Sequence, residues 1–116
     1  MMRETNPAFM NGVPELLVLR CLAEREMYGY ELVQEIRGRT DGALAAGEGV
    51  IYPLLHSLER DGAVKASRRT VQGRSRVYYV LTPKGGERFA GLKDTWLTLT
   101  HAIRGALEGT AHAPAV

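Results

Sequence analysis

Five basic side chains gather in a short stretch of this 116-residue chain and are the clearest candidates for binding chemistry. They are Lys65, Arg68, Arg69, Arg74 and Arg76, with no acidic residue among them. Residues 1–62 carry six Arg against ten Asp or Glu, whereas residues 63–116 carry nine Lys or Arg against three acidic residues. The small net charge of +2 therefore hides a basic second half. Such a cluster is typical of a polyanion-binding surface, although a solvated loop that is basic by chance would look the same.

The other reactive residue types form no catalytic or metal-binding pattern. His56, His101 and His112 lie in three separate segments without a cysteine or a second histidine at ligand spacing, so we expect no metal site. Cys21, the single cysteine, stands among leucines and is predicted to be a core residue. No nucleophile with a neighbouring base and no phosphate-binding glycine loop is evident. We therefore expect neither an enzyme nor a cofactor.

Composition and hydropathy predict one globular domain away from any membrane. The chain is 45% hydrophobic and 24% charged, the balance of an ordinary soluble domain. Its longest apolar runs, such as residues 16–19, are far shorter than the roughly 20 residues that cross a bilayer. The first residues lead into no signal-peptide pattern. We expect a cytoplasmic protein.

Apolar periodicity predicts four helices and one hairpin. Helical spacing of apolar residues covers residues 14–25, 28–40, 49–60 and 83–107. Residues 41–47 are predicted to be a turn, with an alanine-extended helix as the alternative. Pro53 implies that the third helix starts late or lacks one backbone hydrogen bond. Alternating residues at 77–81 predict a strand that pairs with residues 63–70 across a turn at 72–75.

The order of these elements predicts the fold class. Three helices followed by a basic hairpin are the layout of a winged helix-turn-helix, a mainly α fold with a small β-hairpin (α+β). At 100° per residue, the third helix turns Ile51, Leu55 and Leu58 inward. It turns outward the candidates for contacts with base edges and DNA backbone, namely Pro53, His56, Ser57 and Arg60. The five basic hairpin residues are the candidates for phosphate contacts.

The last helix carries the clearest periodicity of the chain. Its apolar residues repeat every seven positions in two series, Phe89, Trp96, Ile103 and Leu92, Leu99, Ala106. This 3.5-residue spacing predicts lengthwise packing against another helix. We expect a winged-helix DNA-binding domain over residues 1–83, a C-terminal dimerisation helix over residues 84–109 and a disordered tail over residues 110–116.

Several motifs, in order and at this spacing, resemble the PadR-like transcriptional regulators in their short form with one C-terminal helix. The resemblance covers nearly the whole chain. Its motifs are Tyr28-Gly29-Tyr30-Glu31-Leu32, Ile51-Tyr52-Pro53-Leu54-Leu55 with Leu58-Glu59 and Asp61-Gly62, Gly73-Arg74-Ser75-Arg76, and Tyr78-Tyr79-Val80-Leu81-Thr82-Pro83-Lys84-Gly85.

The resemblance implies a homodimer that binds a palindromic operator in double-stranded DNA and represses a gene, in some members until a small molecule releases it. It implies DNA contacts by Tyr52, Arg74 and Arg76. Val50 stands where the family usually has Ser or Thr, and His56 and Ser57 stand where it often has Lys or Arg. The resemblance therefore implies a larger share of phosphate binding for the hairpin.

Trp96 has two interpretations that are compatible with each other. It packs the dimer core, as its place between Phe89 and Ile103 indicates, or it stacks on a planar aromatic small molecule, as a tryptophan in this part of the helix does in some short family members. Two alternatives to a DNA-binding regulator also follow from the sequence. One is a winged-helix adaptor for protein partners, and the other is a small-molecule binding protein with its pocket at the dimer interface.

Overall fold

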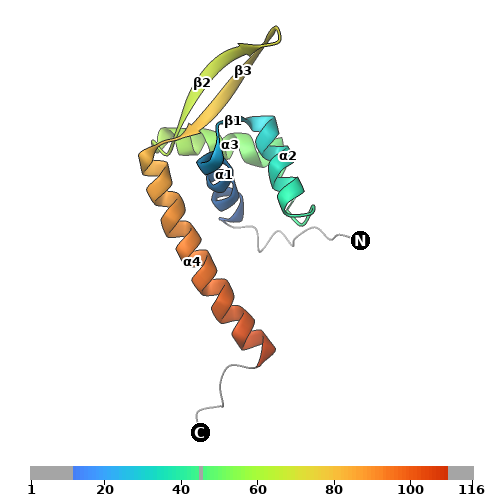
Figure 1. Ribbon diagram of the computed structural model, residues 1–116, viewed down its shortest axis with the longest axis vertical. Coiled ribbons are helices and arrows are strands. Elements are labelled where there is room, and N and C mark those ends of the chain that lie inside the picture. The colour runs from blue at the N-terminus through green and yellow to red at the C-terminus, as the bar shows by residue number, and fades with distance from the viewer. Residues whose placement is uncertain (1–11, 45, 110–116) are drawn as a thin grey trace.

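Four helices and a three-stranded antiparallel sheet make up the structure, a computed structural model that describes residues 12–44 and 46–109 (Figure 1). In chain order the elements are α1 (Val13–Glu24), β1 (Met27–Tyr28), α2 (Gly29–Arg39), α3 (Glu48–Arg60), β2 (Val64–Val71), β3 (Arg74–Leu81) and α4 (Pro83–Glu108). The predicted α+β fold class and the four predicted helices are confirmed. The predicted tail at residues 110–116 lies outside the described residues.

A single core joins the first three helices to one face of the sheet. Leu19 of α1, Leu32 and Ile36 of α2 and Met27 of β1 are fully buried in it. Cys21 is buried there as predicted, and burial raises the pKa of its thiol. Residues 40–44, which follow α2, form a turn rather than a longer helix, and Leu44 is part of the core. Thr40 holds this turn, because its Oγ1 donates to the Ile36 carbonyl and accepts from the Leu44 amide.

The hairpin closes in two residues, so the predicted four-residue turn at 72–75 is wrong. Gln72 and Gly73 both have positive φ angles, 53° and 77°, and this backbone matches the twist of two paired strands. Val71 pairs with Arg74, and Thr70 pairs with Ser75. The hydrogen-bonded ladder therefore extends to the turn. The second strand begins at Arg74 rather than at residue 77, so Arg74 and Arg76 lie in the strand and not in a loop.

The short strand β1 was not predicted. Met27 and Tyr28 pair with Tyr79 and Tyr78 of β3, which gives the sheet order β1-β3-β2. Two residues are too few for an alternating pattern, so no sequence signal marked them. This strand connects the hairpin directly to the start of α2.

Helix α3 begins before Pro53 and includes it. Proline has no backbone N–H, so α3 lacks the bond that this residue would donate to the Gly49 carbonyl. Of the two predicted consequences of Pro53, the structure shows the missing hydrogen bond. Ile51, Leu55 and Leu58 are fully buried, which confirms the predicted inward face.

Helix α4 leaves the domain at a tight junction between three segments. Thr82 caps the helix by accepting from the Gly85 amide at 3.0 Å, and its hydroxyl donates to the Gly62 carbonyl at 2.6 Å. A Cβ atom on Gly85 would lie 2.0 Å from the carbonyl oxygen of Ala63. From this junction α4 runs away from the hairpin and extends past the other helices (Figure 1).

Replacing Gly85 with Ala should lower the free energy of unfolding by about 1–3 kcal/mol, because the new methyl group overlaps backbone that cannot move independently of β2. Gly86→Ala is the matched control. Its Cβ would meet only a Leu81 side-chain atom at 4.0 Å, so it should raise stability by about 0.5–1 kcal/mol through helix propensity. Urea unfolding at one protein concentration measures both. Equal effects of the two variants would contradict the role of this junction.

Candidate nucleic-acid interface

The outward face of α3 is exposed and carries polar and basic groups. Pro53, His56 and Arg60 are exposed, and Ser57 is partly exposed. Neither His56 nor Arg60 forms an ion pair with another described residue. Val50, on the flank of the same face, is 45% exposed. The helix therefore presents to solvent the residues that the sequence assigned to base edges and phosphates.

Tyr52 lies on the other flank of α3, where its ring covers the start of α2. A Cβ atom on Gly29 would lie 2.5 Å from the ring carbons of Tyr52 and 2.7 Å from its hydroxyl oxygen. The ring thus occupies the space that a side chain at Gly29 would need. Burial raises the pKa of the Tyr52 hydroxyl, with a smaller contribution from the Glu48 carboxylate. Tyr52 is therefore a partly buried residue at the contact between α2 and α3.

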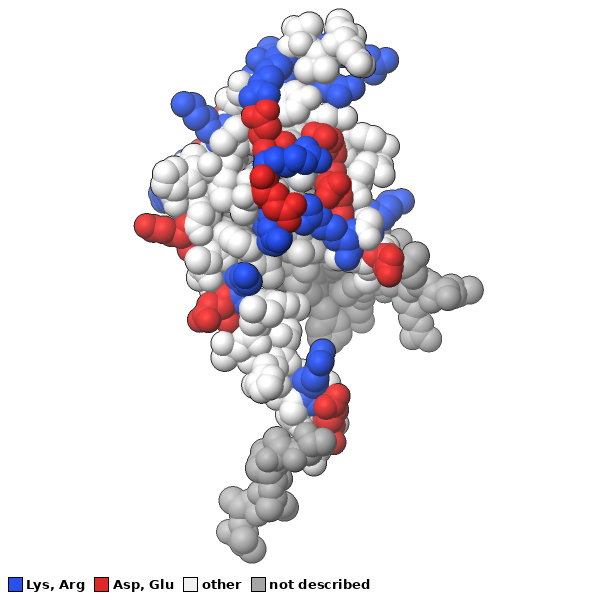
Figure 2. Space-filling model, viewed as in Figure 1, with Lys and Arg blue, Asp and Glu red and all other residues white. Residues whose placement is uncertain are grey.

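The two faces of the hairpin differ in composition. Val64, Ala66, Val77, Tyr79 and Leu81 pack against the core. Strand alternation and the cross-strand register place Lys65, Arg69, Arg74 and Arg76 on the opposite, outer face. Figure 2 shows Lys and Arg near the tip of the hairpin without acidic neighbours, and acidic side chains further down the same face of the molecule.

Four of the five basic hairpin residues have no ion pair among the described residues. These are Lys65, Arg68, Arg74 and Arg76. Arg68 donates only to the Ser75 hydroxyl, at 3.0 Å. Unpaired cations on a protruding hairpin are available to an external anion.

Arg69 is the exception, because it forms an ion pair with Glu26 through both guanidinium NH₂ groups and both carboxylate oxygens. Its guanidinium also lies over the ring of Tyr78, 4.9 Å from the centroid. Tyr78 meets Tyr28 edge to face at 5.4 Å, and Arg76 lies over Tyr28 at 4.4 Å. The middle of the hairpin's outer face therefore carries a layer of alternating cations and aromatic rings.

The apolar face of α4 that packs against the core extends along the helix into a part that is exposed to solvent. Phe89 and Leu92 pack against the core of their own chain. At 100° per residue, Trp96, Leu99 and Ile103 follow on the same side, and they are 42%, 52% and 46% exposed. Ala106, the last residue of the predicted seam, is exposed too. A stripe of apolar residues thus extends beyond the domain with no described partner.

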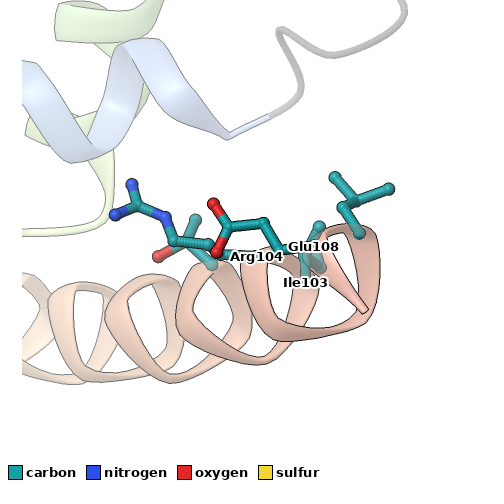
Figure 3. Close-up of a pocket in the computed structure, with 5 residues that line it drawn as sticks. Ile103, Arg104 and Glu108 are labelled. Carbon is teal, nitrogen blue, oxygen red and sulfur yellow. The ribbon is translucent and has the colours of Figure 1, made fainter. Parts of the chain in front are cut away.

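A shallow hollow of about 340 Å³ lies near the far end of α4. It is lined by Thr100, Ile103, Arg104, Leu107 and Glu108 (Figure 3). Figure 3 shows Arg104 and Glu108 extending from the same side of the helix. All five residues belong to α4, so the hollow is open to solvent on its other side. A second structural element would be needed to enclose it.

Comparison with known proteins decides the family. The sequence model of the transcriptional regulator PadR-like family matches residues 18–91, from α1 into α4. The chain is 33% identical over 104 residues to the transcriptional regulator Rv3488 of Mycobacterium tuberculosis, an alignment that covers 90% of this chain and 92% of that protein. The chain belongs to the PadR-like family. Transcription regulation and DNA binding follow from this membership.

Solved structures of transcriptional regulators have the same fold. The PadR-like transcriptional regulator of Bacillus cereus matches with a TM-score of 0.77 at 26% identity, over 90% of this chain and 99% of that one. A Streptococcus transcriptional regulator matches with a TM-score of 0.74 at 32% identity, over 87% and 98% of the two chains. The predicted winged-helix class and the predicted family are thereby confirmed. In the part of the PadR-like chain that the structure describes, no helix is long and apolar enough to cross a membrane.

The structure places the residues that the sequence singled out on two neighbouring elements, and it adds others. The α3 residues lie on a helix that contacts β2, the first strand of the hairpin that carries the cations. The predicted roles of these side chains in this PadR-like protein stay predictions. Sequence reasoning missed Glu26, Tyr28 and Tyr78 around Arg69, since Glu26 and Arg69 are 43 residues apart in the chain. It also missed the contact of Gly29 with Tyr52, although the Tyr28-Gly29-Tyr30 motif is plain in the sequence.

Gly29→Ala should displace the Tyr52 ring. We expect a loss of about 1–3 kcal/mol in the free energy of unfolding from overpacking, and a fall in the Tyr52 pKa toward its usual value of about 10 as the ring gains solvent. Gly38→Ala, in the same helix with no atom within 4 Å, is the control and should be neutral or stabilising by up to about 1 kcal/mol. Urea unfolding and an NMR titration of labelled tyrosines measure both effects. An unchanged Tyr52 pKa in the Gly29 variant would contradict the proposed packing.

Proposed function

We propose that this chain is a homodimeric repressor that binds an inverted-repeat operator, with α3 in the major groove and the β2–β3 hairpin on the flanking DNA backbone. The unpaired cations of α3 and the hairpin carry the proposal. Among the described residues, no carboxylate pairs with Arg60, Lys65, Arg68, Arg74 or Arg76. Phosphates are the partners that such groups take in a DNA-binding family.

The two elements divide the work of recognition. The side chains of Pro53, His56 and Ser57 are compact, so they can approach base edges in the groove. Arg60 and the hairpin cations Lys65, Arg68, Arg74 and Arg76 neutralise phosphates and fix the position of the protein on the duplex. Tyr52, at the seam with α2, contacts the DNA from the flank of α3.

The exposed apolar stripe of α4 is the dimer interface. Trp96, Leu99 and Ile103 continue the face that Phe89 and Leu92 bury within the chain. A second α4 packed lengthwise would cover the stripe down to Ala106 and match its seven-residue spacing. Helix α4, the dimerisation segment of residues 84–109, thus serves two roles. Its first turns complete the DNA-binding domain of residues 1–83, and the rest joins two copies.

Repression follows from occupancy of the operator, and release follows from a ligand at the dimer interface. Trp96 is 42% exposed in the single chain. Its indole offers a flat surface on which a planar aromatic compound can stack between two α4 helices. Such a ligand would change the angle between the helices and so the spacing of the two hairpins.

Selection of binding sites from a random duplex library tests the function directly. At both low and near-physiological salt we expect enrichment of an inverted repeat with half-sites about one helical turn apart, because two-fold symmetry presents two α3 helices. Salt-dependent binding without enrichment would reject the operator and favour an adaptor or a ligand-binding protein.

The same selection and a salt series of DNA affinity are carried out with the variant Arg74→Ala/Arg76→Ala. It should keep the selected sequence but reduce the slope of log affinity against log salt by about 0.9 for each phosphate that the hairpin no longer neutralises. His56→Ala/Ser57→Ala should instead change the selected sequence more than the overall affinity. The same motif from all three proteins would contradict the division of work between α3 and the hairpin.

Leu99→Asp should separate the dimer. The change removes about 1.5–3 kcal/mol of apolar burial per copy and adds a charge, so the dimer dissociation constant should rise at least about tenfold. Leu97→Asp is the matched control, because Leu97 is equally exposed at 54% but lies about 100° around the helix from Trp96. Sedimentation equilibrium measures both. Equal dissociation constants for the two variants would place the interface elsewhere.

A further inference from the structure

We propose that Glu26 limits the affinity of this protein for DNA of any sequence by holding Arg69 away from phosphates. The proposal rests on the DNA-binding role of the hairpin proposed above. Glu26 would then be a positioning residue that limits phosphate binding by Arg69, rather than a residue that contacts DNA. No local spacing in the sequence indicates it, because the two partners meet only in the folded sheet.

Two contacts fix the guanidinium of Arg69 where it is. The ion pair with Glu26 uses both of its NH₂ groups, and the face of the group lies over Tyr78. Two parallel hydrogen bonds to one carboxylate fix the guanidinium in orientation as well as in position. The pair lowers the pKa of Glu26, so the carboxylate stays charged at neutral pH.

The same pair remains open to solvent. The side chains of Arg69 and Glu26 are 41% and 37% exposed. Arg69 lies opposite Arg76 in the ladder, on the outer face that also carries Lys65 and Arg74. It is thus in the middle of the surface assigned to phosphates, and it is the one cation of that described surface with a carboxylate attached. A phosphate that approaches this surface must compete with Glu26 for Arg69.

This competition acts on all DNA equally, because phosphate contacts carry no sequence information. Binding to non-specific DNA is almost entirely electrostatic. The loss of one cation therefore removes the whole contribution of one phosphate contact from its affinity. Binding to the operator also has contacts to base edges, which Glu26 does not touch. A cation withheld from phosphates therefore lowers the affinity for the operator and for genomic DNA by the same factor and leaves their ratio unchanged.

A structural role for the pair makes the opposite prediction. If Glu26 served only to hold the hairpin against the first two helices, its removal would loosen the hairpin and lower the affinity for DNA. If Glu26 keeps Arg69 from phosphates, its removal should raise that affinity. The sign of the change therefore separates the two roles.

The experiment compares Glu26→Gln with the wild type on a duplex of random sequence across a salt series. Arg69 can then neutralise one more phosphate, so the slope of log affinity against log salt should steepen by about 0.9. At 0.1 M salt the affinity for this duplex should be roughly eightfold higher, as one additional neutralised phosphate implies. The ratio of operator affinity to random-duplex affinity should stay the same, because the gained phosphate contact is independent of sequence.

Glu24→Gln is the matched control, because it removes the same charge from a residue that pairs with Arg39 and Arg20 rather than with the hairpin. Its salt slope should equal that of the wild type. In an Arg69→Gln background, Glu26→Gln should no longer steepen the slope. Circular dichroism and urea unfolding of each variant verify that the fold is retained.

Three results would overturn the proposal: lower affinity of Glu26→Gln, a slope equal to that of Glu24→Gln, or a steeper slope that persists without Arg69. These outcomes are separate from the test of the operator. If the wild type selects no inverted repeat, the proposed function fails, yet the slopes on random duplex still decide the role of Glu26. If the wild type binds no duplex even at low salt, both proposals fail.

Discussion

The absent side chain of Gly29 is the constraint on which the binding surface depends. The ring of Tyr52 fills that space, so α3 can approach the first turn of α2 closely. Gly29 directly follows Tyr28 of β1, which pairs with the hairpin strand β3. One short segment, residues 26–29, thus contacts the outward helix on one side and the base of the hairpin on the other. The position of α3 relative to the hairpin depends on this segment, because both elements contact it.

A second close contact couples this surface to α4. The Ala63 carbonyl accepts from the Thr82 amide and lies where Gly85 has no side chain. Arg88, one turn further along α4, forms ion pairs with Glu15 of α1 and with Asp61 at the end of α3. The direction of α4 is therefore tied to the end of α3 and to both hairpin strands. In a dimer joined through α4, a change in the angle between the two helices would move both hairpins without any rearrangement of the core.

Sequence periodicity predicted the four helices and the hairpin, but it did not predict which of their residues contact one another. Ile51, Leu55 and Leu58 could be assigned to the core because helical spacing alone decides which residues share a face. The predicted hairpin turn is two residues too long, since the positive φ angles of Gln72 and Gly73 are compatible with several loops until the strand register is known. The strand at Met27 and Tyr28 and the pair of Glu26 with Arg69 had no local signal. They arise from packing between segments that are distant in the chain.

The distribution of charge has a physical logic that the net value of +2 conceals. Three acidic residues of the first half pair with arginines of the same half: Glu24 and Glu35 with Arg39, and Glu31 with Arg25. These exposed pairs add little stability, but they keep carboxylates near cations of their own and away from the hairpin. The hairpin in turn has no acidic residue of its own. Glu26 stands at the border between the two regions. A single carboxylate there alters the electrostatic field over the outer face of the hairpin more than one placed among the paired charges of α1 and α2. The reason is that the Coulomb interaction weakens with distance and is screened within about 8–10 Å.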